Sequence, residues 1–180
     1  DAPIDVTDRV DVHELTAPKG GIEFRHLTFR YPDGEYDVLQ DISFTVTPGE
    51  SVGIVGKTGA GKTALVDLLL RTYNVADGTL FVDGQDVNSL SIHSVRNACA
   101  YVPQENFLFS DTIAHNIGFG VDDAAQEDID RAAALADVRD NIVDFKDGYE
   151  TVLGERGVTV SGGQKQRISI ARALLKDAPI

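Results

Sequence analysis

Four scarcities narrow what this 180-residue chain can be. It has no methionine, no tryptophan, a single cysteine (Cys99), and 16 Lys and Arg residues against 29 Asp and Glu residues. One cysteine excludes an intramolecular disulfide, so we expect a buried structural thiol in a reducing compartment. No apolar run is long enough to cross a bilayer, and no secretory signal opens the sequence.

The scarcity of basic residues leaves a formal net charge of −13. Such a surface repels the phosphates of nucleic acids and anionic lipid headgroups. We therefore expect no nucleic-acid partner and interpret the charge as a solvated acidic surface. The lack of methionine and the ending "KDAPI" predict a C-terminally truncated piece of a longer chain.

The order of sequence patterns predicts an α/β fold. Residues 1–20 are polar and acidic and predict a linker from an upstream domain. Alternating stretches at 22–31 and 38–46 predict an N-terminal antiparallel β subdomain. Short apolar segments at 51–56 and 98–105 predict strands that alternate with helices, which implies a core with a parallel sheet.

The remaining segments are predicted to be mainly helical. A strand and turn are expected over 78–87, and an α-helical subdomain, about 106–160, is expected to be inserted into the core. Helices are predicted over 62–73, 111–117, 125–145 and 161–175.

"IVGKTGAGKT" contains the pattern G-x-x-x-x-G-K-[ST] between an apolar segment and a helix, which predicts a P-loop. With this motif, the expected parallel sheet is that of a P-loop NTPase core. Glycines allow backbone N–H groups to point at phosphate oxygens, and the helix N-terminus adds positive potential. Lys62 is expected to contact the β- and γ-phosphates, and the Thr63 hydroxyl to bind Mg²⁺. The competing interpretation is a plain glycine-rich turn. The predicted nucleotide-binding residues of the loop are Gly56, Lys57, Thr58, Gly59, Ala60, Gly61, Lys62, Thr63 and Ala64.

"VSGGQKQR" is the second informative motif. Ser161 followed by Gln164 predicts a capping box, and Ile168, Ala171, Leu174 and Leu175 predict a buried stripe. A cap does not need two consecutive glycines, which weaken a first helical turn. Bare backbone at a helix N-terminus suits close approach to an anion.

These motifs together resemble the nucleotide-binding domain of an ATP-binding cassette (ABC) transporter, from about residue 22 to 180. "FRYPDG" resembles the adenine-stacking loop, with Tyr31 as the stacking ring. "GKTGAGKT" is the P-loop, and "YVPQE" resembles the glutamine loop, with Gln104 reaching Mg²⁺ and the attacking water. "SGGQ" resembles the signature motif. "FLFSDTIAHNI" and "TVLGERG" resemble exporter segments near the membrane domain, with Glu155 against its intracellular helices; a helix cap at Ser110 or Asp111 and an ordinary turn are the alternatives.

The resemblance implies a head-to-tail pair of cassettes with ATP and Mg²⁺ between them. Tyr31, the P-loop and Gln104 would serve one nucleotide. The signature residues Ser161, Gly162, Gly163 and Gln164 would serve the nucleotide of a partner cassette, in a homodimer or a heterodimer. Residues 21–180 would be a partial cassette, joined through 1–20 to a transmembrane domain of the same polypeptide, at the cytoplasmic face of the membrane.

The sequence departs from the family pattern at two positions, and three functional residues of the family are expected outside it. Ala64 replaces a second hydroxyl residue, and Val160 replaces the leucine that opens the signature. The Walker B aspartate, the catalytic glutamate and the switch histidine would follow Ile180, so we expect residues 1–180 to bind ATP weakly and to hydrolyse it negligibly. The histidines, expected at the surface or in packing roles, are His13, His26, His93 and His115.

Three functions remain open at this point. The first is the ATPase engine of a membrane exporter. The second is a soluble ABC-type ATPase that acts on nucleic acid or the ribosome, against which the acidic charge stands. The third is a P-loop kinase or GTPase, which would leave "SGGQKQR" and "YVPQE" unexplained.

Overall fold

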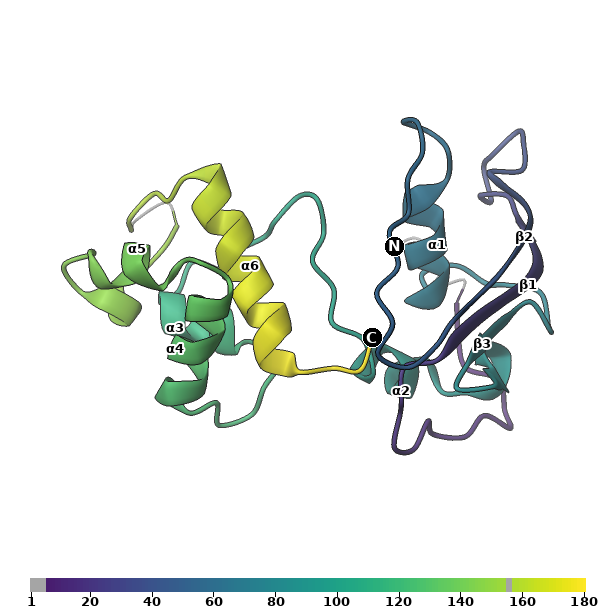
Figure 1. Cartoon of the computed structure of the whole chain (residues 1–180), viewed down its shortest axis with the longest axis horizontal. Helices are drawn as coiled ribbons and strands as arrows, with labels where there is room; N and C mark the ends of the chain where they lie inside the picture. The colour runs from purple at the N-terminus through teal and green to yellow at the C-terminus, as the bar shows by residue number, and fades with distance from the viewer. Residues whose placement is uncertain (1–5, 155–156) are drawn as a thin grey trace. The chain divides into compact units, whose positions relative to one another are not determined.

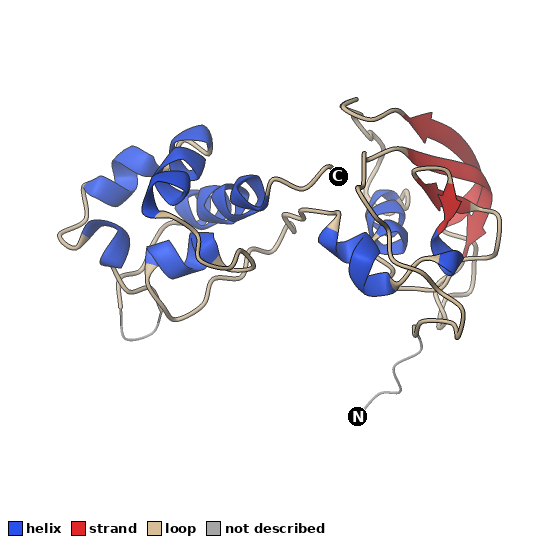
Figure 2. Ribbon diagram, turned by 90° about the horizontal axis from the view of Figure 1, so that it is seen from below, coloured by secondary structure: helices blue, strands red, loops and turns tan. Residues whose placement is uncertain are grey.

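The computed structural model describes residues 6–154 and 157–180. These residues form two compact units, one built from the chain up to Cys99 together with Pro179 and Ile180, the other from residues 100–178. All strands of the described ranges belong to the first unit, and the second is built of helices and loops (Figures 1 and 2).

An antiparallel sheet with the order β2-β1-β3-β4 forms one side of the first unit. Its strands are β1 (Ile22–Phe29), β2 (Leu39–Val46), β3 (Leu80–Val82) and β4 (Gln85–Asp86). The central strand β1 pairs with both neighbours, since Ile22 lies opposite Val46 on one side and Val82 on the other. The α/β class, the antiparallel N-terminal sheet and the strand and turn over 78–87 are thereby confirmed.

The two parallel strands expected from the apolar segments 51–56 and 98–105 are absent. Neither segment forms a ladder with any strand of the described ranges, and Val55 is 94% exposed. A parallel strand of an α/β core is covered on both faces and takes hydrogen bonds from its neighbours. No neighbour in the described residues supplies these bonds, so apolar composition alone did not make these segments strands.

Helix α1 (Lys62–Leu69) packs against the core of the first unit through Ala64, Leu65 and Leu68. A 3-10 turn η1 (Val87–Ser89) and helix α2 (Ile92–Asn97) follow β4. Cys99 is buried at the edge of this unit, as expected. The largest fully buried side chains of this core are Leu27, Leu68, Leu80, Leu90, Val82, Val87 and Val95.

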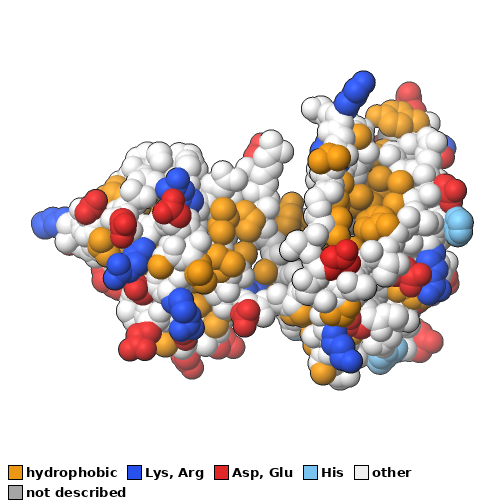
Figure 3. Space-filling view, in the orientation of Figure 1, with side chains coloured by type: hydrophobic (Ala, Val, Ile, Leu, Met, Phe, Trp, Pro, Cys, Tyr) orange, Lys and Arg blue, Asp and Glu red, His pale blue; other side chains and the backbone are white. Residues whose placement is uncertain are grey.

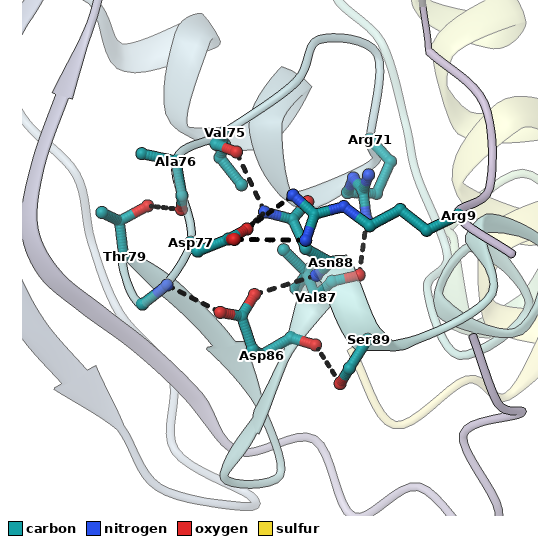
Figure 4. A network of polar contacts seen from close by, with 11 residues as sticks. Arg9, Arg71, Val75, Ala76, Asp77, Thr79, Asp86, Val87, Asn88 and Ser89 are labelled. Carbon is teal, nitrogen blue, oxygen red and sulfur yellow. Dashed lines mark hydrogen bonds and ion pairs between the residues drawn. The ribbon is translucent and has the colours of Figure 1, made fainter. Parts of the chain in front are cut away.

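Residues 6–21, which precede β1, lie along the first unit rather than away from it. Arg9 forms an ion pair with Asp77 at 2.6 Å, and the same carboxylate accepts a hydrogen bond of 2.7 Å from Asn88 (Figure 4). The hydrogen bonds from Arg9 lower the pKa of Asp77 below its usual range. The backbone N–H of His13 donates to the Ser89 carbonyl at 3.0 Å. The expected linker to an upstream domain stays a prediction.

The second unit is a cluster of helices around the long helix α6 (Gly162–Lys176), drawn yellow in Figure 1. The other elements are α3 (Ile113–Gly118), α4 (Gln126–Leu135), α5 (Arg139–Val143) and the 3-10 turn η2 (Gly148–Glu150). The predicted helices are confirmed, although the stretch 125–145 is two helices because Asp137 takes a left-handed φ of 56°. The fully buried side chains Ile113, Ile117, Ile142 and Ile168 belong to its core.

Candidate functional site

Gly61 is the residue through which the P-loop enters α1. It is the N-cap of the helix and has a φ of 82°. A Cβ atom here would lie 2.8 Å from the Val38 carbonyl oxygen and 2.8 Å from Cδ2 of Leu39. Glycine is therefore required at this position by both backbone conformation and space.

The side chain of Lys62 curls back over the loop. Its ammonium donates hydrogen bonds of 2.7 Å to the carbonyl oxygens of both Gly56 and Lys57. No side chain of the described residues caps the N-terminus of α1, so its first amide groups are left for an outside acceptor. The loop thus combines a cation, helix amides without an intrahelical partner and glycine-rich backbone. Together they form an anion-binding site, which fits the phosphates of a nucleotide.

The two residues after Lys62 differ sharply in exposure. Thr63 is exposed on the first turn of α1, whereas Ala64 is fully buried. The Thr63 hydroxyl is thus one hard oxygen ligand of the kind Mg²⁺ prefers. The described residues contain no cluster of acidic, histidine or cysteine side chains that could hold a metal ion. A Mg²⁺ ion at Thr63 would therefore rely on nucleotide phosphates and water for its other ligands.

Tyr31 lies in a cluster of three aromatic rings. Its ring centroid is 5.0 Å from that of Phe29 and 5.2 Å from that of Tyr73, and both pairs are edge-to-face. The ring is partly exposed. Burial raises the pKa of the Tyr31 phenol, with a smaller contribution from Asp67, so the ring is uncharged at neutral pH and can stack on a base.

The signature motif begins α6 with the predicted capping box. Ser161 Oγ accepts a hydrogen bond of 3.2 Å from the Gln164 backbone N–H, and Gln164 Oε1 accepts one of 2.9 Å from the Ser161 N–H. The serine hydroxyl accepts in this contact, which leaves its own hydrogen available to donate.

Space is open around the two signature glycines. A Cβ atom on either Gly162 or Gly163 would meet nothing within 4 Å. Packing within the described residues therefore gives no reason for glycine here, although glycine costs helix stability. Ile168 and Ala171 are buried as predicted, whereas Leu174 is 44% exposed, so the predicted stripe is wrong there.

The model of the ABC transporter family matches residues 39–180 of this chain. The chain belongs to the ABC transporter family.

Relatives of this ABC chain include named exporters and transporters. It is 46% identical over 172 residues to ATP-binding cassette sub-family B member 6 of Xenopus tropicalis, covering 96% of this chain and 20% of that protein. It is 41% identical over 178 residues to the mitochondrial iron-sulfur clusters transporter atm1 of Neurospora crassa, covering 98% and 25%. The chain thus spans a quarter or less of either relative.

A solved structure of a bacterial Atm1-family ABC exporter with ATP bound superposes on the ABC chain. The TM-score is 0.92 at 40% sequence identity, covering 100% of this chain and 32% of the exporter chain. No helix in the described ranges of the ABC chain is long and apolar enough to cross a membrane.

The predicted site residues of the ABC chain fall in both units. Tyr31 and the P-loop lie in the first unit, whereas Gln104 and the signature lie in the second. Gln104 is exposed in a bend after Pro103. Joint binding of Mg²⁺ by Thr63 and Gln104 stays a prediction.

The two exporter-like stretches lie side by side in the second unit. The Leu153 N–H donates to the Asp111 carbonyl at 2.9 Å, and the Ile113 N–H donates to the Thr151 carbonyl at 3.0 Å. The cap of α3 is Thr112, which accepts from the His115 N–H at 3.1 Å, rather than Ser110 or Asp111. Glu155 lies outside the described residues.

An arginine that the sequence analysis missed braces the signature helix. Arg172 donates hydrogen bonds to the Asn116 carbonyl at 2.6 Å, to Asn116 Oδ1 at 3.1 Å and to the Phe107 carbonyl at 3.2 Å. Burial lowers the pKa of the guanidinium. Only its place within a helical pattern was visible in the sequence, because its partners are more than 50 residues away.

The histidines of the ABC chain are all exposed, as predicted. Each has a polar partner: Gln85 for His13, Asp41 for His26, Asn97 for His93, and Asp111 for His115.

Proposed function

We propose that this chain is a nucleotide-binding cassette that binds ATP with Mg²⁺ and powers export of a substrate across a membrane. The observation that carries the proposal is the pair Gly162 and Gly163, which open a helix without any packing reason for glycine. Such bare backbone fits the approach of a ligand from outside the unit. The iron-sulfur clusters transporter among the relatives supports a role in transport, and the similar structure of an ABC exporter supports export as its direction.

Within one chain, the first unit would hold the nucleotide. The Lys62 ammonium exchanges the Gly56 and Lys57 carbonyls for the β- and γ-phosphate oxygens, and the α1 amides donate to the same anion. The Thr63 hydroxyl contributes an oxygen to Mg²⁺. Tyr31 would stack on the adenine. Gln104, a residue of the second unit, would orient the attacking water.

The signature would act on the nucleotide of a second cassette, either another copy or a related chain. The Ser161 hydroxyl keeps a free hydrogen, and the N-terminus of α6 adds positive potential. Both would meet a γ-phosphate, which ADP lacks. The pair of cassettes would then bind ATP more tightly than ADP. Binding of ATP would therefore close the pair, and hydrolysis to ADP would open it.

The partner that turns this cycle into transport would be a transmembrane domain of the same polypeptide, at the cytoplasmic face of the membrane. A hollow of about 840 Å³ in the second unit supports a docking role. Phe109, Asp111 and Ala114 from the exporter-like stretch line it.

The first experiment compares nucleotide binding by two lysine variants of the full-length protein. Lys62→Ala should weaken Mg-ATP binding by roughly 10-fold or more, because a charge-assisted contact to phosphate is lost. The control Lys19→Ala removes an exposed lysine of the same unit, outside the P-loop, and should stay within about 2-fold of wild type. Equal effects of the two substitutions would reject the P-loop assignment.

The second experiment separates the signature from the P-loop. Ser161→Ala should leave the ATP affinity of unpaired cassettes unchanged while reducing ATP-driven association of cassettes, measured by cross-linking in vesicles with ATP or ADP. Loss of ATP affinity by unpaired Ser161→Ala cassettes would contradict action on the partner's nucleotide. ATP turnover that ignores the membrane and responds to nucleic acid or ribosomes would instead favour a soluble ABC-type ATPase.

A further inference from the structure

Three aromatic rings in the first unit form a closed cluster, and only one of them, Tyr31, has an expected contact with the nucleotide. Phe29, Tyr31 and Tyr73 each contact the other two, with ring centroids separated by 5.0, 5.2 and 5.6 Å. Phe29 is buried, and the two tyrosines are partly exposed. Phe29 and Tyr31 come from the end of β1 and the turn after it, whereas Tyr73 comes from a separate part of the chain.

The position of Tyr73 is tied to the helix that carries the P-loop. It follows α1, whose C-terminal end is closed by hydrogen bonds from the Leu70 N–H to the Val66 carbonyl at 2.9 Å and from the Thr72 N–H to the Asp67 carbonyl at 2.8 Å. The opposite end of the same helix begins at Lys62. The backbone of Tyr73 is thus connected, through α1, to the phosphate cradle.

The turn that carries Tyr31 is fixed by local contacts at both sides. The Gly34 N–H donates to the Tyr31 carbonyl at 2.9 Å, and the Val38 N–H donates to the Phe29 carbonyl at 2.8 Å. These bonds hold the backbone but leave the Tyr31 side chain free to change rotamer. The rings of Phe29 and Tyr73 lie at 78° and 75° to the Tyr31 ring, and they fix its plane.

We propose that Tyr73 is a positioning residue for nucleotide-base recognition: its ring holds the Tyr31 ring in one plane at a set distance from Lys62. This inference rests on the proposed ATP binding and on Tyr31 as the stacking ring. A ligand that must meet a base-stacking ring and a phosphate cradle together binds tighter when both are pre-organised. Phe29 alone cannot supply the link to α1, since it belongs to β1.

The test compares two probes in the full-length protein: Mg-ATP, which has a base, and inorganic tripolyphosphate, which has none. Tyr73→Leu removes the ring and keeps much of the side-chain volume. It should raise the Kd for ATP about 3- to 10-fold, the range expected for one aromatic pair, and leave the Kd for tripolyphosphate unchanged. Tyr73→Phe should bind ATP like wild type, because the ring rather than the hydroxyl makes the contacts.

The matched control is Phe44→Leu, which removes one ring of another aromatic pair in the same unit. Phe44 stacks on Phe24 with centroids 4.7 Å apart. The two leucine variants should lose similar thermal stability, while only Tyr73→Leu should discriminate between the probes. If Phe44→Leu also weakens ATP alone, or if Tyr73→Leu weakens both probes equally, the positioning role is overturned and Tyr73 is a packing residue.

A double-mutant cycle with Tyr31 completes the test. In a Tyr31→Leu background, Tyr73→Leu should have no further effect on ATP affinity, because the ring it positions is gone. Full additivity would overturn the inference. If Tyr31→Leu leaves ATP affinity unchanged while Lys62→Ala abolishes it, the inference fails and the proposed ATP binding stands. If the wild-type protein binds neither probe, the proposed function itself fails.

Discussion

Helices α1 and α6 both have glycine at the N-terminus, as the N-cap Gly61 of α1 and as the first two residues of α6, but the surroundings of these glycines differ. At α1, Gly61 has a left-handed φ, no room for a Cβ atom, and no side-chain cap on the helix. At α6, Ser161 and Gln164 form a complete capping box, and Gly162 and Gly163 face open space. One glycine is demanded by the fold of its own unit. The other two are unexplained within their unit, so we attribute them to an outside ligand.

This difference shows how to separate a structural glycine from a functional one. Substitution of the first kind should damage stability and function together. Substitution of the second kind should damage function and leave stability equal or better, since alanine favours helices over glycine. The stability of each unit must be measured separately, because the chain forms two compact units. Figure 3 shows a patch of hydrophobic side chains on the surface of the first unit.

The largest effect is expected for Gly61→Ala. The left-handed backbone costs about 1–2 kcal/mol for a residue with a Cβ atom, and overpacking against the Val38 carbonyl adds about 1–3 kcal/mol. Denaturant unfolding should show this loss, and hydrogen exchange should place it in α1. Gly59→Ala is the matched control, because Gly59 has the same φ of 82° but open space around it. Equal losses in the two variants would mean that the contact with Val38 carries no weight.

The next largest effect is expected when Arg172, which anchors α6 to Asn116 of α3, is replaced. Arg172→Met should destabilise the second unit by roughly 2–3 kcal/mol, since hydrogen bonds from a charged donor are lost and Asn116 Oδ1 loses one partner. Asn116 is fully buried, so it has no access to replacement water. Arg131→Met, which removes an exposed arginine paired with Asp128 on α4, should cost less than about 0.5 kcal/mol. Hydrogen exchange of the amides in the second unit measures the loss of stability in both variants. If Arg172→Met exchanges like wild type, the hydrogen bonds of Arg172 do not stabilise α6.

A smaller change of opposite sign is expected for Gly163→Ala. The added methyl group meets nothing, and helix propensity should stabilise α6 by about 0.5–1 kcal/mol. ATP-driven association of cassettes should nevertheless fall, because the methyl group blocks close approach to the first turn. Thermal unfolding and cross-linking with ATP measure the two effects in the same sample. Lower stability in this variant would place Gly163 with Gly61 as a structural glycine.

The smallest effect is expected in the pH dependence of the free energy of unfolding of the second unit. The Asp130 carboxylate accepts hydrogen bonds from the Tyr149 hydroxyl at 2.8 Å and from Arg139 Nε at 2.9 Å, and these lower its pKa. A lowered pKa in the folded state stabilises the protein above the unfolded value of about 4. This contribution is lost as the pH falls through the folded pKa.

The measurement compares wild type with Asp130→Asn in urea between pH 7 and pH 3. The wild type should be slightly more stable at pH 7, since the groups are partly exposed and screened. The difference should shrink below about pH 4. A difference that stays constant down to pH 3 would rule out titration of this carboxylate as its source.

The match between sequence and structure was best where a pattern acts within a few residues. The capping box at Ser161 and the strand and turn over 78–87 were predicted from short spacings and are present. Prediction failed where a segment needs a distant neighbour. Residues 51–56 have strand-like composition, yet no strand of the described residues pairs with them.

The sequence by itself determined the family, the α/β class and the two glycine-rich motifs, because each depends on residue types at fixed spacing along one short segment. Tertiary structure alone decided which glycine the fold requires. It also decided that Arg172 donates hydrogen bonds to Asn116 and that the ring of Tyr73 packs against that of Tyr31. These contacts join residues that are far apart in the chain, and their distances are set by the packing of whole helices and strands, which no local pattern encodes.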